Sequence, residues 1–249
     1  HSNLRRQRQM CIRDRYRLME TQNYIIEFMS DEWIRNTIIS FFSILIILFL
    51  SNNFFNKEQK LKIVKILSLL MIIMTVTDHS RNIMNGLWNI SENLPLQLCG
   101  LTNLIACSVL FTKLNKRVFE FFYYAGIIGG IQAFLTPQIN NFDGTNFEYI
   151  SYHSSHAGII LIPIFLYLNL NHAITKFSWF RVWIYLNIII AFIIPLNFQI
   201  DSNYMYLASP PNVDNPLLIG EWPYYIFFWE IIMILFTYTL YVISTKKFV

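Results

Sequence analysis

The chain has 249 residues, of which 55% are hydrophobic and 14% are charged, and its mean hydropathy is +0.41. A soluble domain normally carries about a quarter charged residues, so this composition excludes an ordinary soluble domain and indicates a polytopic membrane protein. The formal net charge of +4 depends on six arginines within the first 18 residues, namely Arg5, Arg6, Arg8, Arg13, Arg15 and Arg17. We therefore expect no nucleic-acid partner.

Residues 1–18 contain no apolar run, so they are not a signal peptide. Their arginine-rich string resembles a translated adapter sequence, with the natural start at Met19, and the alternative is a basic arm at the membrane surface. We predict that residues 1–18 are non-native or disordered, and that residues 19–249 form a single integral membrane domain.

Seven apolar stretches of membrane-spanning length follow in chain order. They are Trp33–Leu50, Leu61–Ile83, Pro95–Thr112, Val118–Thr136, Ile150–Leu170, Phe180–Gln199 and Pro223–Ile243. The sequence therefore predicts an all-α polytopic bundle of about seven transmembrane helices. Within the fourth stretch, Gly126 and Gly130 form a small-xxx-small pair, for which we favour packing inside the bundle over a dimer interface. The oligomeric state stays open.

Basic residues separate the two sets of connections. Eleven lie in the odd-numbered connections and the C-terminal tail: Lys57, Lys60, Lys62, Lys65, Lys113, Lys116, Arg117, Lys176, Arg181, Lys246 and Lys247. From Met19 onward, the other side holds only Arg35 and Arg81, together with most of the acidic residues, Asp214 among them. The positive-inside rule then predicts that the N-terminus is outside and the C-terminus inside.

Polar and ionisable side chains gather at the outer ends of the predicted spans, where each one needs an explanation. They are Asp78, His79, Arg81, Gln97, Cys99, Gln132, Thr136, His153, His156 and Glu230. Each has an ordinary structural explanation when taken alone. Because several spans place such residues at one depth, we predict a polar pocket that faces the outer leaflet.

Cys99 is the candidate nucleophile of this pocket. Pro95 suits a first helical turn, which would place Cys99 near a helix N-terminus, where the dipole favours a thiolate. A cysteine nucleophile needs a base, and His156 or His153 can supply one, with Glu230 to orient the ring. Cys107, two turns further along, is assigned to packing, and no disulfide or cysteine metal motif is expected.

From residue 94 onward the chain resembles a known family. Its motifs are Leu94-Pro95-Leu96-Gln97-Leu98-Cys99, Leu135-Thr136-Pro137, Ser155-His156-Ala157-Gly158, Asn203-Tyr204-Met205-Tyr206-Leu207 and Gly220-Glu221-Trp222-Pro223-Tyr224. They resemble the YwaF-type bacterial integral membrane proteins, which are related to the animal transmembrane protein one-six-four (TMEM164).

The resemblance implies a membrane acyltransferase that moves a fatty acyl chain between glycerophospholipids, with Cys99 and His156 as the catalytic pair. It implies a bacterial cytoplasmic membrane, phospholipid and lysophospholipid partners, and no cofactor or metal. Gln97 departs from the motif, which usually has His there, so no acid–base role is expected at this position. Possible supporting residues are Gln97, Glu230, His153, His79, Thr136 and Tyr204, with Gln97 and Thr136 as candidate oxyanion donors.

Three alternatives stay open. The same Cys–His pair can act as a lipid hydrolase with water as the acceptor. A metal-dependent hydrolase can use His79, His153 and His156 as ligands, with Asp78 nearby. A small-solute transporter or sensor can use the same outer polar residues to bind its solute, although the paired broken helices of many transporters are missing.

Overall fold

The computed structural model describes residues 22–213 and 215–245. These residues form seven α-helices, α2 (Asp31–Phe54), α3 (Lys57–Met84), α4 (Leu98–Ser108), α5 (Lys116–Leu135), α6 (Asn146–Asn169), α7 (Ser178–Gln199) and α8 (Tyr224–Thr245), with two strands, β1 (Gln22–Ile25) and β2 (Gln138–Phe142), and a 3₁₀-helix, η1 (Tyr204–Tyr206). The predicted all-α polytopic bundle is confirmed. The predictions for residues 1–18, Asp214, Lys246 and Lys247 lie outside the described residues.

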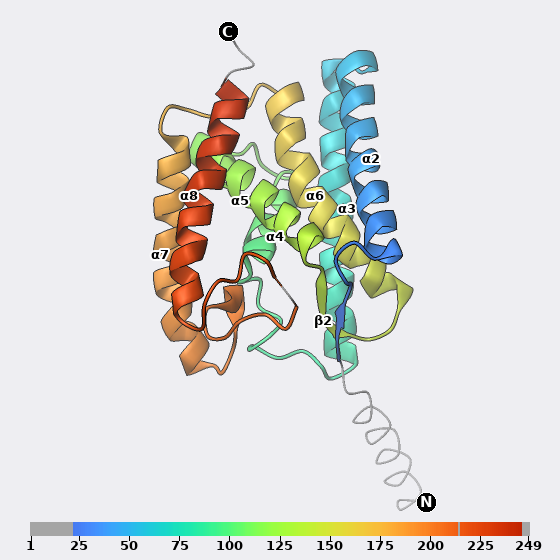
Figure 1. Ribbon diagram of the computed structural model, residues 1–249. Coiled ribbons are helices and arrows are strands. Elements are labelled where there is room, and N and C mark those ends of the chain that lie inside the picture. Colours follow the sequence, from blue (N-terminus) through green and yellow to red (C-terminus); the bar gives the residue numbers. More distant parts are fainter. Residues whose placement is uncertain (1–21, 214, 246–249) are drawn as a thin grey trace, which may run out of the picture.

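The helices run alternately in opposite directions, so α2 begins at one end of the bundle and α8 finishes at the other (Figure 1). The connections α2–α3, α4–α5 and α6–α7 share one end, which we call the inner end. It carries nine of the basic residues that set the predicted orientation: Lys57, Lys60, Lys62, Lys65, Lys113, Lys116, Arg117, Lys176 and Arg181. The opposite end, which we call the outer end, carries Arg35 and Arg81.

Polar caps fix where the helices begin. The side chain of Ser30 accepts a hydrogen bond from the backbone N–H of Trp33, and Thr145 accepts one from that of Glu148. Asn56 forms a capping box with Gln59. These side chains satisfy N–H groups that have no partner within their helix. At α2, α3 and α6, short polar residues therefore set the helix starts a few residues ahead of the apolar runs.

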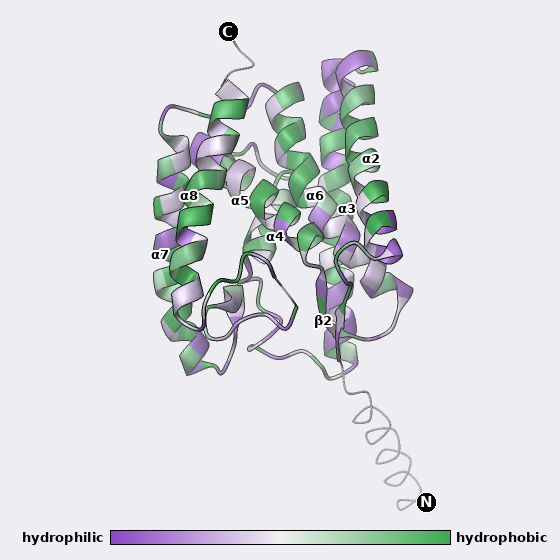
Figure 2. Ribbon diagram, viewed as in Figure 1, coloured by the Kyte–Doolittle hydropathy of each residue, from purple (hydrophilic) through white to green (hydrophobic). Residues whose placement is uncertain are grey.

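Four helices, α2, α5, α7 and α8, are long and apolar enough to cross a membrane. The outward faces of α2, α7 and α8 expose large hydrophobic side chains, such as Phe42 and Phe49 on α2 and Ile231 and Leu235 on α8. Figure 2 shows hydrophobic residues along these helices and hydrophilic residues mainly in the connections and at the helix ends. Contiguous apolar surface of this extent is rare in soluble proteins and suits contact with lipid.

Helix α5 crosses the middle of the bundle obliquely and is the most buried of the four (Figure 1). A Cβ on Gly126 would lie 2.6 Å from the backbone oxygen of Ile159, and one on Gly130 would lie 2.4 Å from Cγ1 of Ile160. Both glycines therefore allow α6 to pack directly on the backbone of α5. This confirms that the pair serves packing inside the bundle.

The third predicted span is wrong in length, because α4 covers only Leu98–Ser108 rather than Pro95–Thr112. At 1.5 Å per residue it is about 16 Å long, roughly half the hydrocarbon thickness of a membrane. Ser68 of α3 explains where it ends. Its hydroxyl lies 2.6 Å and 2.9 Å from the carbonyl oxygens of Ala106 and Cys107 and accepts a hydrogen bond from Leu110 N–H, so the end of α4 is satisfied by another helix.

A small antiparallel sheet at the outer end is missing from the predicted elements. Strand β1 pairs with β2, with Tyr24 opposite Ile139 and Ile25 opposite Gln138. The strands have four and five residues, which is too short for an alternating pattern to be distinguished from a loop. The sheet matters because β2 directly follows α5 and carries residues of the candidate site.

Candidate functional site

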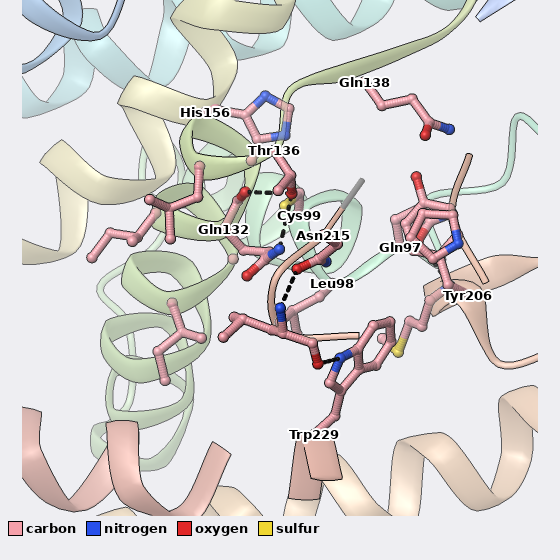
Figure 3. A pocket seen from close by; sticks show the side chains of 18 of the residues that line it. Gln97, Leu98, Cys99, Gln132, Thr136, Gln138, His156, Tyr206, Asn215 and Trp229 are labelled. Carbon is pink, nitrogen blue, oxygen red and sulfur yellow. Dashed lines mark hydrogen bonds between the residues drawn. The ribbon is translucent and has the colours of Figure 1, made fainter. Parts of the chain in front are cut away.

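A cavity of about 680 Å³ extends from the outer end of the bundle down between α5, α7 and α8, and we call it the main cavity. It is lined by several residues that the sequence singles out: Asp78, Gln97, Cys99, Gln132, Thr136, His156 and Glu230. Figure 3 shows Cys99, Thr136 and His156 grouped at one side of it. The main cavity contains several of the polar residues that predict a pocket, but most of its lining is apolar rather than polar.

Cys99 is the second residue of α4. The helix begins at Leu98, three residues later than expected, so Pro95 precedes the first turn instead of lying within it. Gln97 is the N-cap residue, and its side chain makes no capping hydrogen bond. The first backbone hydrogen bond of the helix runs from Leu101 N–H to the Gln97 oxygen. The N–H groups ahead of it have no partner within the helix and surround Cys99.

Two adjacent glycines of α5 bring the helices of Cys99 and His156 together. A Cβ on Gly129 would lie 3.2 Å from the sulfur of Cys99, and a Cβ on Gly130 would lie 3.0 Å from the backbone oxygen of His156. Helices α4 and α6 therefore both pack closely on α5 at the same level, and they also contact each other. Larger residues at these two positions would push Cys99 and His156 apart.

The imidazole of His156 has a defined tautomer. Its Nδ1 lies 2.7 Å from the backbone oxygen of Tyr152, one turn earlier on α6. A carbonyl oxygen only accepts hydrogen bonds, so Nδ1 carries the proton in the neutral ring and Nε2 keeps a free lone pair. The Tyr152 ring packs 4.3 Å from the imidazole, centroid to centroid, and limits its rotation. Nε2 is thus the nitrogen that can act as a base.

The structure places Cys99 and His156 in one cavity without joining them. Within residues 22–213 and 215–245, no hydrogen bond connects the thiol of Cys99 to the ring of His156. In ligand-free enzymes the catalytic hydrogen bonds are often long, and they shorten when the substrate binds. The two side chains would have to approach each other before a proton passes between them.

Thr136 and Gln132 form a pair beside Cys99 (Figure 3). Gln132 Nε2 donates to Thr136 Oγ1 at 3.0 Å, and Thr136 Oγ1 donates to the Gln132 backbone oxygen at 3.3 Å. The hydroxyl proton of Thr136 is thus already donated in a hydrogen bond to the backbone. Thr136 can donate to a substrate oxygen only by giving up its bond to the backbone, which weakens it as a candidate oxyanion donor.

Gln97 links α4 to the long outer connection. Its Oε1 accepts a hydrogen bond from Met205 N–H at 2.7 Å, and its Nε2 has no hydrogen-bond partner among the described residues. Tyr204 supports the same junction, because its hydroxyl donates to the Ile90 oxygen at 2.8 Å and accepts from Leu94 N–H at 2.9 Å. Tyr204 is buried and holds the segment before α4 against η1.

Glu230 lines the main cavity from α8, but its partners belong to α7. Its Oε2 accepts hydrogen bonds from Trp183 Nε1 at 2.7 Å and from Asn187 Nδ2 at 2.9 Å. The sequence offers Glu230 as the group that orients the histidine ring. In the structure the backbone oxygen of Tyr152 orients the His156 ring, and Glu230 instead joins α7 to α8.

His79 and His153 are engaged elsewhere and are not among the residues that line the main cavity. His79 Nδ1 accepts from Trp88 Nε1 at 3.0 Å, while His153 contacts the Tyr149 oxygen through Nδ1 and Asn36 through Nε2. Among the described residues, no three His, Cys, Asp or Glu side chains are grouped closely enough to hold a metal ion. The three-histidine site of the metal-dependent alternative is thus not assembled.

Tyr152 is a site residue that the sequence reasoning missed. It lines the main cavity, donates from its hydroxyl to the Ala133 oxygen at 3.1 Å and accepts from Gln138 N–H at 3.3 Å. It therefore joins α6 to the end of α5 and the start of β2, while its carbonyl orients His156. Its spacing of four residues before His156, one helical turn, is the signal that could have identified it.

An ion-pair cluster lies at the outer rim of the main cavity. Arg81 of α3 forms an ion pair with Asp143, which follows β2, and also donates to Thr145 at 2.9 Å. Burial alone would raise the pKa of Asp143, but hydrogen bonds from Glu148, Thr145 and Arg81 outweigh it and lower that pKa to about 2. Asp143 is therefore charged at neutral pH and ties α3 to the β2–α6 connection.

Comparisons with known proteins give one assignment. Comparison with curated proteins and with solved structures gives no significant match. A model of the TMEM164 family matches residues 28–241, which is most of the chain and includes the main cavity, Cys99 and His156. Together with the apolar helices, this match identifies an integral membrane protein, and the chain belongs to the TMEM164 family.

Proposed function

We propose that this protein is a membrane acyltransferase that moves a fatty acyl chain between glycerophospholipids through a thioester on Cys99. The observation that supports this most strongly is the composition of the main cavity. Cys99 and His156 line one side of it, and His156 carries its free lone pair on Nε2. In this proposal the site faces the outer leaflet of a bacterial cytoplasmic membrane. The positive-inside rule supports the outer leaflet, because most basic residues lie at the opposite end.

The apolar part of the main cavity suits a fatty acyl chain. It is lined by Ile128, Leu186, Ile190, Met233, Phe236, Leu240 and Ile243. From Glu230 to Ile243 the lining follows α8 for about 20 Å at 1.5 Å per residue. Half of a membrane's hydrocarbon core is about 15 Å thick, so an acyl chain from one leaflet fits this length. Its ester group would then lie at the depth of Cys99.

In the first half of the reaction the Cys99 thiol passes its proton to His156 Nε2, and the thiolate attacks the ester carbonyl of the donor lipid. The N–H groups of the first turn of α4, which have no partner within the helix, and Gln97 Nε2 are the candidate donors for the oxyanion. The ester C–O bond then breaks, His156 returns the proton to the leaving alkoxide, and a lysophospholipid departs. The acyl chain stays on Cys99.

In the second half an acceptor hydroxyl attacks the thioester carbonyl. His156 Nε2 takes the hydroxyl proton, the C–S bond breaks, and the proton passes to the sulfur of Cys99. If water replaces the acceptor hydroxyl, the same steps release a free fatty acid. The transferase and the hydrolase therefore share one site and differ only in what reaches the thioester.

A transfer assay in defined vesicles tests the proposal. The vesicles contain a phospholipid with a labelled acyl chain and an unlabelled lysophospholipid, and the products are separated as acylated acceptor and free fatty acid. We expect labelled acceptor with the parent protein, and loss of product with Cys99→Ala and His156→Ala. Cys107→Ala is the matched control, because Cys107 lies on the same helix outside the lining of the main cavity. Transfer that survives Cys99→Ala contradicts the proposal.

A further inference from the structure

A second cavity, of about 430 Å³, lies at the outer end beyond the main cavity, and we call it the outer chamber. It is formed by the segment before α4, strand β2 and the long connection between α7 and α8. Five residues line both cavities: Gln97, Gln138, Asn140, Tyr206 and Pro211. The two cavities therefore share a wall. Gln97, which is part of this wall, precedes Cys99 by two residues in the chain. What binds in the outer chamber lies next to the thioester.

The lining of the outer chamber is rich in uncharged hydrogen-bonding groups. Amides and hydroxyls dominate it: Asn23, Ser91, Gln97, Gln138, Asn140, Ser202, Asn203, Tyr204, Tyr206, Ser209 and Asn212. Its two carboxylates, Glu92 and Asp201, belong to exposed residues. None of the described residues that line it is Lys, Arg or His. Phosphate sites normally use Arg or Lys, so this lining disfavours an anionic ligand.

The wall of the outer chamber is held in place by its own hydrogen bonds. Asn203 Oδ1 accepts from the backbone N–H groups of Ala208 at 3.1 Å and Ser209 at 3.0 Å. Gln138 Oε1 accepts from Val213 N–H at 3.1 Å, which joins β2 to the same connection. Gln97 Oε1 is likewise occupied by Met205 N–H, while its Nε2 donor keeps no partner within the described part of the chain. The wall is thus preorganised and retains an open donor at the shared boundary.

We infer that the outer chamber binds the acceptor of the acyl chain, and that this acceptor presents an uncharged polyol, meaning glycerol or sugar hydroxyls. The inference rests on the proposed acyl transfer and specifies its second substrate. Neutral hydroxyls match the amide and hydroxyl lining, since each can both donate and accept. The polyol oxygen forms a C–O bond with the thioester carbonyl, the C–S bond to Cys99 breaks, and the hydroxyl proton moves through His156 Nε2 to the sulfur. The product is a polyol ester and free Cys99.

The polyol can be free in water or carried as the headgroup of a lipid, and an acceptor competition distinguishes the two. Vesicles with a labelled donor phospholipid receive one of four acceptors: glycerol, methyl glucoside, a lysophospholipid with a glycerol headgroup, or a lysophospholipid with a choline headgroup. We expect saturable acylation of at least one of the three acceptors that carry a polyol, free or on a lipid headgroup, at a rate about tenfold above that with the choline lipid. Equal or faster transfer to the choline lipid overturns the inference.

A variant that fills the outer chamber gives a second, independent measurement. Ala208 lines the outer chamber but not the main cavity, so Ala208→Trp should reduce the volume available to the acceptor. We expect KM for the polyol to rise about tenfold while the acyl-thioester on Cys99 still forms. Ile219→Trp is the matched control, because Ile219 lies in the same connection, is exposed and lines neither cavity.

The outcomes separate this inference from the proposed function. A thioester on Cys99 with an unchanged polyol KM in Ala208→Trp overturns the outer chamber as the acceptor site and leaves the acyl-enzyme intact. Formation of no thioester with any acceptor overturns the proposed function itself. If only free fatty acid is released in the presence of every polyol, water is the acceptor and the polyol inference is wrong.

Discussion

The Nδ1 of His156 donates to the backbone oxygen of Tyr152 at 2.7 Å, one helical turn earlier on α6. This contact does what a carboxylate does in a catalytic triad, since it fixes the tautomer and the direction of the ring. The ring therefore presents Nε2 as a base without an acidic third member. A backbone carbonyl stabilises an imidazolium less than a carboxylate does. In the proposed reaction His156 would therefore accept the thiol proton from a fixed position, without the charge of an acidic partner.

Gly129→Ala tests the contact between α5 and the nucleophile. The new Cβ would lie 3.2 Å from the sulfur of Cys99, a distance at which the thiol must move by a few tenths of an ångström. We expect kcat for acyl transfer to fall about tenfold to hundredfold, because a small misplacement of a reacting group has effects of this size. The thermal midpoint of the purified protein should change little.

Gly130→Ala is the matched comparison. Its Cβ would lie 2.4 Å from Ile160 Cγ1 and 3.0 Å from the His156 oxygen, so α5 and α6 would have to separate. We expect a clear loss of thermal stability there, about 1–3 kcal/mol, as for other overpacked cores. If Gly129→Ala loses activity but also loses as much thermal stability as Gly130→Ala, then Gly129 serves packing alone.

Gln97→Glu separates the two roles of the Gln97 side chain. The carboxylate still accepts the hydrogen bond from Met205 N–H, but the Nε2 donor is lost and a negative charge faces the developing oxyanion. We expect kcat to fall by about tenfold or more with the stability retained. Gln97→Ala should instead lower the stability by about 1–3 kcal/mol, because it leaves Met205 N–H unpaired. Full activity in Gln97→Glu would exclude Gln97 Nε2 from catalysis.

The ion cluster at the inner end should contribute to stability and not to activity. Glu120 of α5 is fully buried and forms ion pairs with Arg117 at 3.0 Å and Arg181 at 3.2 Å. Glu120→Gln should lower the free energy of unfolding by up to about 3 kcal/mol. This value is at the low end of the range for a broken buried ion pair, because both arginines remain accessible to solvent. Thermal unfolding in detergent measures this.

Glu58→Gln provides the control for that experiment. Glu58 pairs with Lys62 at 2.8 Å, but both side chains are largely exposed, so solvent screens the interaction. We expect no measurable change in its unfolding midpoint. A Glu120→Gln variant that is as stable as Glu58→Gln would contradict the structural role of the buried cluster.

Acid should loosen the outer rim before the rest of the bundle. The pKa of Asp143 is lowered from 3.8 to about 2 in the folded protein, so its contribution is complete above pH 4 and is lost as the pH falls from 4 to 2. We expect the unfolding midpoint to drop in this interval in the parent protein. Asp143→Asn should be less stable at neutral pH and should show a smaller drop. If the unfolding midpoints of the parent and of Asp143→Asn depend on pH in the same way, the stability is not linked to the ionisation of Asp143.

The sequence predicts the membrane bundle well because its signals are local and strong. Apolar runs locate seven helices, and six of the seven predicted stretches agree with the helices to within a few residues, as Phe180–Gln199 does with α7. The exception, α4, ends where Ser68 of another helix takes its carbonyl groups. A tertiary contact of this kind leaves no trace in the local hydropathy.

The candidate site could be predicted only in part. Cys99 and His156 were identified by residue type and motif, and the structure places both in the main cavity. Their orientation depends on a backbone carbonyl at Tyr152 and on the close approach at Gly129, and neither contact has a side-chain pattern in the sequence. The outer chamber was missed because it is assembled from three connections far apart in the chain.

The most direct test of the central claim is the mass of the intact protein after incubation with donor vesicles and no acceptor. We predict one added acyl chain, which hydroxylamine removes as expected for a thioester. The adduct should be absent in Cys99→Ala and present in Cys107→Ala, which keeps Cys99 in the main cavity. An adduct that persists in Cys99→Ala, or acyl transfer by a protein that never forms one, would contradict the thioester mechanism.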